Sequence, residues 1–322
     1  MNFYFAPLEG VTGYTYRNAF ADLFGGPDKY YAPFVSPSCN DRLRGKEIRD
    51  LLPENNNSEI NLIPQILTNN SEYFIKTVIQ LMELGYTEEI NINIGCPSGT
   101  VVAKNKGAGF LRDPDGMERF FDEIFNWRDK NMEKGPNISV KTRIGIYKEE
   151  EFPYILEIYN KYPISELIVH PRTREQMYRE IPNMNAFDYA VNNSRNLLCY
   201  NGDINTVEGY NKIAGMYNIN AVMIGRGLIA NPNLINEIRG GKSITKQQIR
   251  KYHDRLYSDF EMIMKADKHL LFKMKEFWNY VSWNFVEEHK CAKLIRKCQN
   301  LYKYNLAVEE IFTKMEIKNG KE

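Results

Sequence analysis

Polar side chains stand at or near the ends of short apolar runs along much of this sequence. Four of them are Gln65, Asn93, Lys141 and His170. Their amide, ammonium and imidazole groups offer hydrogen-bond donors and a positive charge, which suits a planar, electron-rich ligand. A ring of polar groups on buried strands is costly unless a ligand satisfies it, so we interpret these residues as parts of one binding site.

A second group of residues predicts a phosphate site. Gly225-Arg226-Gly227 follows the last apolar run and opens a helical pattern, so it offers bare backbone N–H groups and a cation. Asn201-Gly202-Asp203 lies in the neighbouring predicted loop. Ring donors combined with a terminal phosphate site fit flavin mononucleotide (FMN). The match of Gly225–Ala230 to G-x-G-x-x-A is only formal, because no acidic residue follows about 20 positions later.

Secondary-structure elements must bring these residues together in one binding site. Over the first 230 residues, short β-rich runs alternate with amphipathic helical patterns, and several runs are nearly all apolar, as in parallel strands buried on both faces. Eight such units within about 240 residues fit an α/β fold of the (β/α)8 or TIM-barrel type. The predicted strands are Phe3–Pro7, Tyr30–Phe34, Leu62–Ile66, Ile90–Ile94, Ile138–Arg143, Leu167–His170, Leu197–Asn201 and Ala221–Gly225.

Helical patterns lie between the strands, and one connection is unusually long. It follows the fourth strand and contains a Gly-rich loop from Gly95 to Asp113. Active sites of such barrels are built from the loops at the carboxyl ends of the strands, so this loop is a place to look for chemistry. The clearest predicted helices are Ser71–Leu84, Gly116–Glu133, Glu149–Tyr162 and Thr206–Tyr217.

The pattern changes after residue 240. From Ser243 onward it is helical only, and we predict a barrel domain at 1–240 and a small helical domain at 241–322. The formal net charge is +5 from Ser243 to the end and −4 before it, which suggests an anionic partner for the tail or simply a solvated helical surface. The aromatic run Phe272–Phe285 is predicted to be mainly bundle core. Lysines predicted to meet phosphate are Lys268, Lys273, Lys275, Lys290, Lys293 and Lys297.

Composition excludes several classes of protein. With 43% hydrophobic and 26% charged residues in 322, the chain is neither disordered nor a disulfide-stapled miniprotein. Five cysteines without a close CxxC pair predict reduced thiols in the cytoplasm, and four scattered histidines predict no metal site. We expect no membrane span and no secretory signal. The oligomeric state is not readable, and a monomer is compatible with the sequence.

Seven motifs in one order make the chain resemble the tRNA-dihydrouridine synthase family. The resemblance covers essentially the whole barrel and continues more weakly into Lys268–Lys273 of the tail. One motif would be weak evidence, whereas seven in register are strong. The motifs are Ala6–Thr12 (APLEGVT), Asn93–Ser98 (NIGCPS), Lys106–Leu111 (KGAGFL), Val140–Gly145 (VKTRIG), Val169–Tyr178 (VHPRTREQMY), Asn201–Ile204 (NGDI) and Ile224–Gly227 (IGRG).

The resemblance implies roles for residues at matching positions. Cys96 would be the general acid, with Asn93 and Arg172 in contact with the substrate. Pro7, Leu8 and Glu9 would border the flavin, and Gln65, Lys141 and His170 would contact its ring system and ribityl chain. The phosphate end would be held by Asn201, Gly202, Asp203, Gly225 and Arg226.

The resemblance also implies a reaction. NADPH would reduce FMN, the flavin would deliver a hydride to C6 of a uracil in tRNA, and a cysteine thiol would protonate C5. A thiol suits this step because it is neutral near pH 7 and still acidic enough to protonate an enolate. Lys141 would stabilise the developing charge. To reach the barrel, the uridine would have to leave its stack.

Two residues depart from the family pattern, and two other functions are also compatible with the sequence. Leu8 stands where the family usually has Met, which is a conservative apolar change. Pro171 stands where the family usually has Gly, and because proline fixes φ and has no N–H, it can change the contacts around Arg172. The first rival is an FMN-dependent barrel reductase of a small molecule, which would not need a basic helical domain. The second is an RNA-binding or RNA-folding protein with vestigial catalysis, which the presence of Cys96, Lys141 and His170 disfavours. The modified uridines, and whether ribosomal RNA is also a substrate, are not readable from one sequence.

Overall fold

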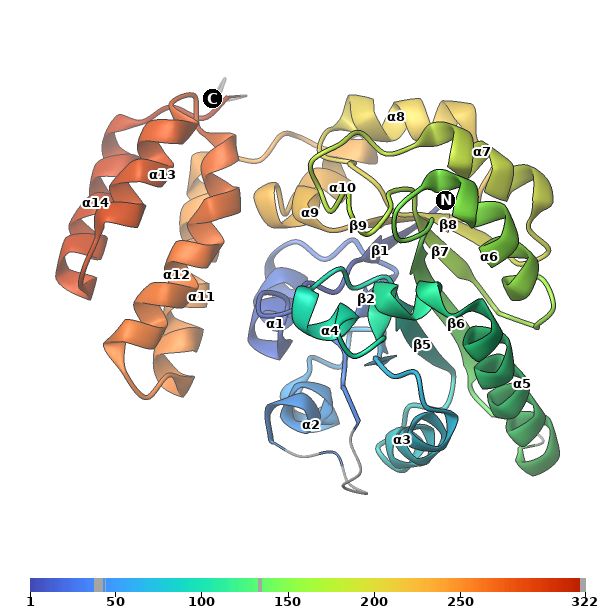
Figure 1. The fold of residues 1–322 in the computed structure, drawn as a ribbon. Helices are drawn as coiled ribbons and strands as arrows, with labels where there is room; N and C mark the ends of the chain where they lie inside the picture. The colour runs from blue at the N-terminus through green and yellow to red at the C-terminus, as the bar shows by residue number, and fades with distance from the viewer. Residues whose placement is uncertain (38–42, 44, 133–134, 319–322) are drawn as a thin grey trace.

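The computed structural model describes residues 1–37, 43, 45–132 and 135–318. A barrel of parallel strands ringed by helices forms the first part of the chain, and four long or medium helices at the left of Figure 1 form the rest. None of the helices in these ranges is long and apolar enough to cross a membrane. Cys39 and the predicted helix end at Glu133 lie outside the described residues.

All the predicted strands are present, and they pair in parallel in the order β3-β2-β1-β9-β8-β7-β6-β5-β4. The third predicted strand appears as two pieces, β3 and β4, with Pro64 between them. Because proline has no backbone N–H, it cannot donate to a neighbouring strand. The strands are β1 (Asn2–Phe5), β2 (Lys29–Tyr31), β3 (Leu62–Ile63), β4 (Gln65–Ile66), β5 (Glu89–Ile94), β6 (Asn137–Arg143), β7 (Leu167–His170), β8 (Leu198–Tyr200) and β9 (Ala221–Ile224).

Helices surround these strands, as Figure 1 shows, and the predicted (β/α)8 barrel is confirmed. The Gly-rich connection after β5 is not plain coil: it holds the short helix α4 and a 3₁₀ turn at Gly107–Arg112. The helices of this part are α1 (Tyr14–Leu23), α2 (Gly45–Leu51), α3 (Ser71–Glu83), α4 (Gly99–Val102), α5 (Pro114–Asn131), α6 (Phe152–Tyr159), α7 (Met184–Asn193), α8 (Val207–Met216), α9 (Arg226–Ala230) and α10 (Leu234–Ile238).

The remaining helices pack around an aromatic core. Phe277, Trp278 and Phe285 are buried there, which confirms the prediction for most of the aromatic run, whereas Phe272 is 66% exposed. Tyr304 joins this core, because its hydroxyl accepts a hydrogen bond from the Trp278 indole at 2.9 Å. The helices are α11 (Lys246–Ile263), α12 (Asp267–Val281), α13 (Glu288–Lys297) and α14 (Leu301–Lys314), and we call this part the helical region.

Two of the six lysines predicted to meet phosphate point into the protein instead. Lys273 donates to the backbone oxygen of Gly10 and to Glu276, so it joins α12 to the turn after β1. Lys275 donates to the backbone oxygen of Cys298 at the end of α13. For these two residues the prediction was wrong, because each ammonium satisfies exposed carbonyl groups of its own chain.

The amino-terminal end of the barrel holds a buried charged cluster. Lys29 lies 2.6 Å from a Glu89 oxygen and 3.8 Å from a Glu166 oxygen, and the Tyr4 hydroxyl donates to Glu166. One buried Glu166 oxygen has no hydrogen-bond partner. Burial raises the pKa of Glu166 to about 7, with Lys29 opposing the shift and Glu89 adding to it.

The free energy of unfolding is therefore expected to fall as pH rises from about 4.5 to about 7. The folded state holds the Glu166 proton more tightly than the unfolded state does, so ionisation costs up to about 3 kcal/mol. A Glu166→Gln variant should lack this loss, as urea unfolding at pH 5 and pH 8 would measure. An exposed Glu59→Gln variant serves as control, and equal pH dependence in all three proteins would refute the expectation.

Candidate functional site

One cavity at the carboxyl ends of the strands collects nine of the eleven residues predicted to bind the cofactor. They come from the ends of β1, β6, β7, β8 and β9 and the loops that follow, which a barrel brings to the same mouth. Ala6 and Tyr178 complete the lining. The nine are Pro7, Leu8, Lys141, His170, Asn201, Gly202, Asp203, Gly225 and Arg226.

Cys96 is held on a tightly bonded loop just after β5. Its backbone N–H donates to the Asn93 side-chain oxygen at 2.9 Å, and its carbonyl accepts from Ala108 at 3.0 Å. Gly107 has a φ of +56°, and a Cβ there would lie 2.9 Å from the Cys96 oxygen, so only glycine lets the 3₁₀ turn close over this loop. The loop is therefore a rigid mount for a partly exposed thiol.

The thiol of Cys96 is suited to give a proton. Burial raises the pKa of Cys96 above its ordinary value, while Lys141 and Arg143 oppose the shift. At neutral pH the sulfur therefore keeps its proton, as a general acid must before it reacts.

Lys141 and His170 face the cavity with different charges. Burial, reinforced by the charge of Arg143, lowers the pKa of Lys141 to about 8, so the ammonium is mostly protonated at pH 7. Burial and four neighbouring cations hold the pKa of His170 well below its usual range, so the imidazole is neutral. Arg172 Nη1 lies 3.1 Å from His170 Nε2 and can only donate, which places the imidazole hydrogen on Nδ1.

Asp203 anchors the side of the cavity predicted to take a phosphate. Two nitrogens of Arg172 donate to its two oxygens, and Arg226 donates to it at 2.7 Å. Although burial opposes ionisation, these arginines hold the pKa of Asp203 below its ordinary value. Arg172 is only 1% exposed, whereas Arg226 remains partly accessible and faces the cavity.

The two loops at this side approach each other closely because of glycine. A Cβ on Gly227 would lie 2.1 Å from the backbone oxygen of Ile204, and one on Gly202 would lie 2.0 Å from the Tyr200 hydroxyl. The loops after β8 and β9 therefore fit together only if Gly227 lacks a side chain, and Gly202 leaves room for the Tyr200 side chain at the end of β8.

Gly227→Ala is expected to prevent most of the predicted flavin binding, because the β9 loop must move away from Ile204. The flavin-to-protein ratio after purification measures this. Gly215→Ala is the control: Gly215 lies in α8 with open space around it, where alanine favours the helix. A Gly227→Ala protein that retains flavin as well as wild type would contradict the expectation.

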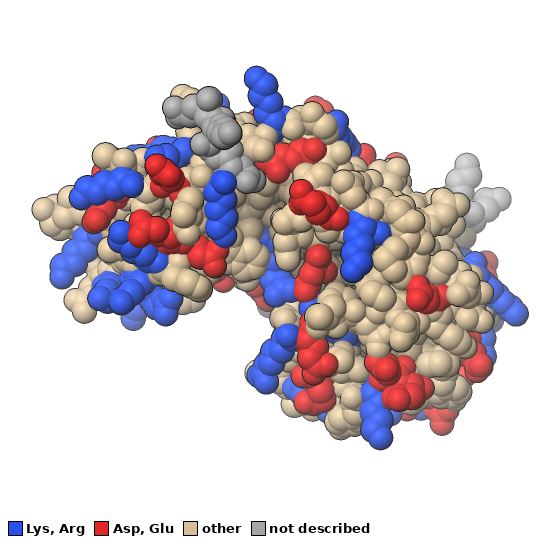
Figure 2. Space-filling view, turned by 90° about the horizontal axis from the view of Figure 1, so that it is seen from above, with Lys and Arg blue, Asp and Glu red and all other residues tan. Residues whose placement is uncertain are grey.

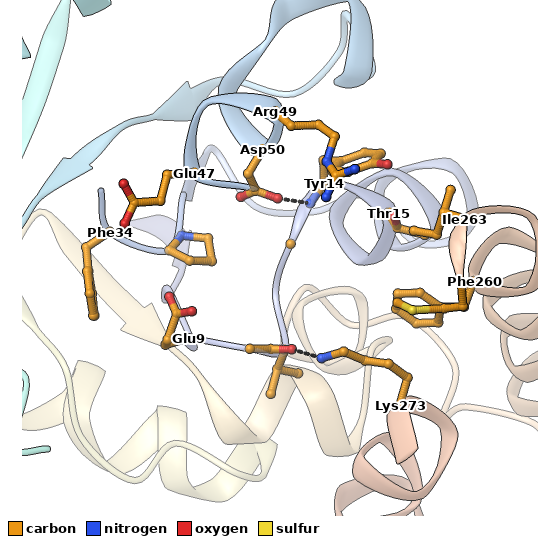
Figure 3. A pocket seen from close by; sticks show the side chains of 15 residues that line it. Glu9, Tyr14, Thr15, Phe34, Glu47, Arg49, Asp50, Phe260, Ile263 and Lys273 are labelled. Atoms are coloured by element: carbon orange, nitrogen blue, oxygen red, sulfur yellow. Dashed lines mark hydrogen bonds between the residues drawn. The ribbon is translucent and has the colours of Figure 1, made fainter. Parts of the chain in front are cut away.

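Five predicted site residues do not line this cavity. One of them is Cys96, which lies on its loop after β5. Gln65 and Asn93 are buried in the barrel below the mouth, and Arg172 is buried behind Asp203. Glu9 lines a neighbouring cavity of about 260 Å³ between the barrel and the helical region. Figure 3 shows this second cavity, with Glu9 and Asp50 on the barrel side and Phe260 and Lys273 on the helical side.

Two residues of the mouth were missed by sequence reasoning, although both stand in the quoted motifs. The buried Arg143 donates to the Gly95 oxygen at 3.0 Å and to the Thr173 oxygen at 2.8 Å, so it ties the Cys96 loop to the loop after β7. Tyr178 lines the cavity, and the Arg226 guanidinium lies 4.7 Å from its ring centre. The sequence feature that could have identified Arg143 is a positively charged residue at the end of an apolar strand.

The donor set fits a flavin nucleotide. Lys141 and the Nδ1–H of His170 can meet the electron-rich ring, and Arg226 with the glycine-lined loops can meet a phosphate. Within the described residues, no group of three or more His, Cys, Asp or Glu side chains could hold a metal ion.

Comparisons with known proteins identify one family. The model of a family described as dihydrouridine synthase (Dus) matches residues 4–316. A "probable tRNA-dihydrouridine synthase" of Staphylococcus aureus (strain N315) is 30% identical over 237 residues, which cover 71% of this chain and 69% of that protein. A "probable tRNA-dihydrouridine synthase 2" of Bacillus subtilis (strain 168) is 29% identical over the same length, with 71% and 70% covered.

Solved structures share the fold at low sequence identity. Morphinone reductase superposes with a TM-score of 0.51 at 10% identity, covering 78% of this chain and 88% of that one. A 2-naphthoyl-CoA reductase gives a TM-score of 0.57 at 11% identity, covering 74% and 50%. These likenesses support the barrel architecture.

Proposed function

Because this chain belongs to the dihydrouridine synthase family, we propose that it reduces uridines of tRNA to 5,6-dihydrouridine with FMN as cofactor and NADPH as electron donor. It is a flavin-dependent oxidoreductase, and tRNA is its substrate class. The observation that carries the proposal is the convergence of nine residues from the family motifs on one cavity.

Different residues of the cavity would contact different parts of the cofactor. Lys141 and His170 would meet the ring system, while Arg226, with the backbone at Gly202 and Gly225, would hold the phosphate. Pro7 and Leu8 would pack against one side of the flavin. Gln65 and Glu9 do not line this cavity, so direct flavin contact by either stays a prediction.

Bound FMN supplies the hydride acceptor and donor that link NADPH to the C6 position of uracil. Cys96 holds a proton for C5, and Lys141 places a positive charge where the reduced base gains electron density. Asn93 and Arg172 are buried and bonded to protein groups, so direct contact of either with the uridine stays a prediction.

We assign RNA docking to residues 241–322 and catalysis to residues 1–240. Figure 2 shows Lys and Arg side chains spread over the helical region at the left, with Asp and Glu among them. Of the lysines predicted to meet phosphate, Lys268, Lys290, Lys293 and Lys297 are exposed. Binding through such residues tolerates many sequences and weakens with salt. We place this activity in the cytoplasm, where tRNA is modified.

The test is mass-spectrometric mapping of dihydrouridine after the purified protein acts on unmodified tRNA transcripts with NADPH. Dihydrouridine carries two more hydrogens than uridine, so each modified position is identified directly. Transcripts of ribosomal RNA in parallel show whether that RNA is also a substrate. The cofactor released on denaturation identifies FMN or FAD, and flavin bleaching by NADPH or NADH ranks the two donors.

One set of results would contradict the proposed function. If NADPH bleaches the flavin and no RNA gains dihydrouridine, while small enones or free pyrimidines are reduced, the enzyme is a small-molecule reductase. Loss of dihydrouridine at defined tRNA positions in cells lacking the gene would support the proposal.

A further inference from the structure

A row of hydrogen-bonded polar side chains runs through the barrel interior beneath Cys96. At its upper end, the side-chain oxygen of Asn93 accepts from the backbone N–H groups of Gly95 at 3.0 Å and Cys96 at 2.9 Å. The amide nitrogen of Asn93 donates to the Gln65 side-chain oxygen at 2.7 Å. Asn93 therefore holds the Cys96 loop through two hydrogen bonds to its backbone, and Gln65 in turn holds the Asn93 side chain.

The row continues downward to the amino-terminal end of the barrel. Gln65 donates to Asn91 at 2.7 Å, Asn91 donates to the Ser139 hydroxyl at 2.8 Å, and Ser139 donates to Glu89 at 2.6 Å. Residues 89, 91 and 93 alternate along β5, so all three face the interior. Gln65, Asn91 and Ser139 are completely buried. We call Glu89, Ser139, Asn91, Gln65 and Asn93 the polar row.

Both ends of the polar row fix the direction of its hydrogen bonds. At the top, backbone N–H groups can only donate, so Asn93 must turn its oxygen upward. At the bottom, Glu89 beside Lys29 is a carboxylate that can only accept, and the Tyr31 hydroxyl also donates to it at 3.1 Å. Each group between can satisfy its neighbours in one orientation only. A break in the middle leaves the amides above it oriented by the backbone N–H groups alone, without the hydrogen bonds from below that fix their position.

We propose that Ser139 and Asn91, through Gln65 and Asn93, are positioning residues for Cys96, and that they set the place of its thiol for proton transfer to the uridine. Neither side chain reaches the mouth, so neither acts on the substrate directly. This inference rests on the proposed function for its effect on activity, but its structural content concerns the Cys96 loop alone.

The experiment compares Ser139→Ala with wild type in two half-reactions. Bleaching of the bound flavin by NADPH should proceed at the wild-type rate, since it needs no proton from Cys96. Dihydrouridine formation by the reduced enzyme in single turnover should slow about tenfold, as expected of a misplaced proton donor. Ser139→Thr keeps the hydroxyl and should restore most of the rate.

A second readout does not depend on the reaction. Iodoacetamide labelling of Cys96, followed over pH by peptide mass spectrometry, reports how the loop holds the thiol. In Ser139→Ala the Cys96 peptide should label several-fold faster, with its midpoint displaced toward that of an ordinary thiol. If wild type forms no dihydrouridine, the proposed function fails and this comparison still decides the inference.

Tyr4→Phe is the matched control. Tyr4 is equally buried at the same end of the barrel, and its hydroxyl donates to Glu166 outside the polar row. If Ser139→Ala slows both half-reactions in the same proportion as Tyr4→Phe, or labels at Cys96 as wild type does, the positioning role is overturned. A Ser139→Ala effect confined to dihydrouridine formation and Cys96 labelling, and reversed by threonine, would support it.

Discussion

Replacing Cys96 by alanine should lower dihydrouridine formation by about 10²- to 10⁴-fold, the usual contribution of a positioned general acid. The thiol sits on a loop fixed by Asn93 and Ala108, and burial keeps it protonated at neutral pH. Its removal should leave flavin content and bleaching by NADPH unchanged. Rapid-quench mapping of tRNA by reduced enzyme measures the loss.

Cys291→Ala is the control for this prediction, since Cys291 is buried in the helical region far along the chain from the mouth. Its activity should match wild type. A Cys96→Ala protein that still forms dihydrouridine at the wild-type rate would remove the thiol from the mechanism. A Cys96→Ala gene that fully supports a strain lacking the original would favour a role in RNA binding alone.

Lys141→Met should lower the same rate by about 10²- to 10³-fold, because it removes a cation at the position where the reduced base gains negative charge. The pKa of about 8 adds a pH dependence: Lys141 is charged below pH 8 and neutral above it. The wild-type rate should therefore fall as pH rises through about 8. Single-turnover rates between pH 6 and 10 measure both effects.

Lys141→Arg separates charge from shape. Arginine stays protonated throughout this range, so the falling limb near pH 8 should disappear even if the maximum rate is lower. If wild type and Lys141→Arg lose activity at the same pH, another group controls the profile. Unchanged activity in Lys141→Met would show that the mouth needs no cation at this position.

Much of the barrel was predictable because its strands carry a simple signal. Parallel strands buried on both faces are runs of apolar residues, and the polar residues that end them stand out at once, as Lys141 and His170 do. Even the break at Pro64 follows from residue type, since a missing N–H must interrupt the pairing.

The partners of buried charged groups were not predictable in the same way. Arg172 and Asp203 stand 31 residues apart, and their pairing exists only because the loops after β7 and β8 meet at the mouth. Lys273 was predicted to meet phosphate because the sequence shows that its side chain is positively charged but not the direction in which that side chain points. The polar row likewise depends on register, which places Gln65 beside Asn91.

The pairing of β1 with β9 bears on how the protein is made. Phe5 lies beside Ile224 in the finished sheet, so the first strand, whose other neighbour is β2, lacks this second neighbour until more than two hundred further residues have been added. At about 5–20 residues per second, a ribosome needs roughly 10–40 s for this stretch. Pro7 and Leu8 follow β1 directly, and their cavity is completed by Gly225 and Arg226. A nascent chain therefore cannot complete its flavin site until the barrel closes, and cofactor uptake belongs to the last stage of synthesis.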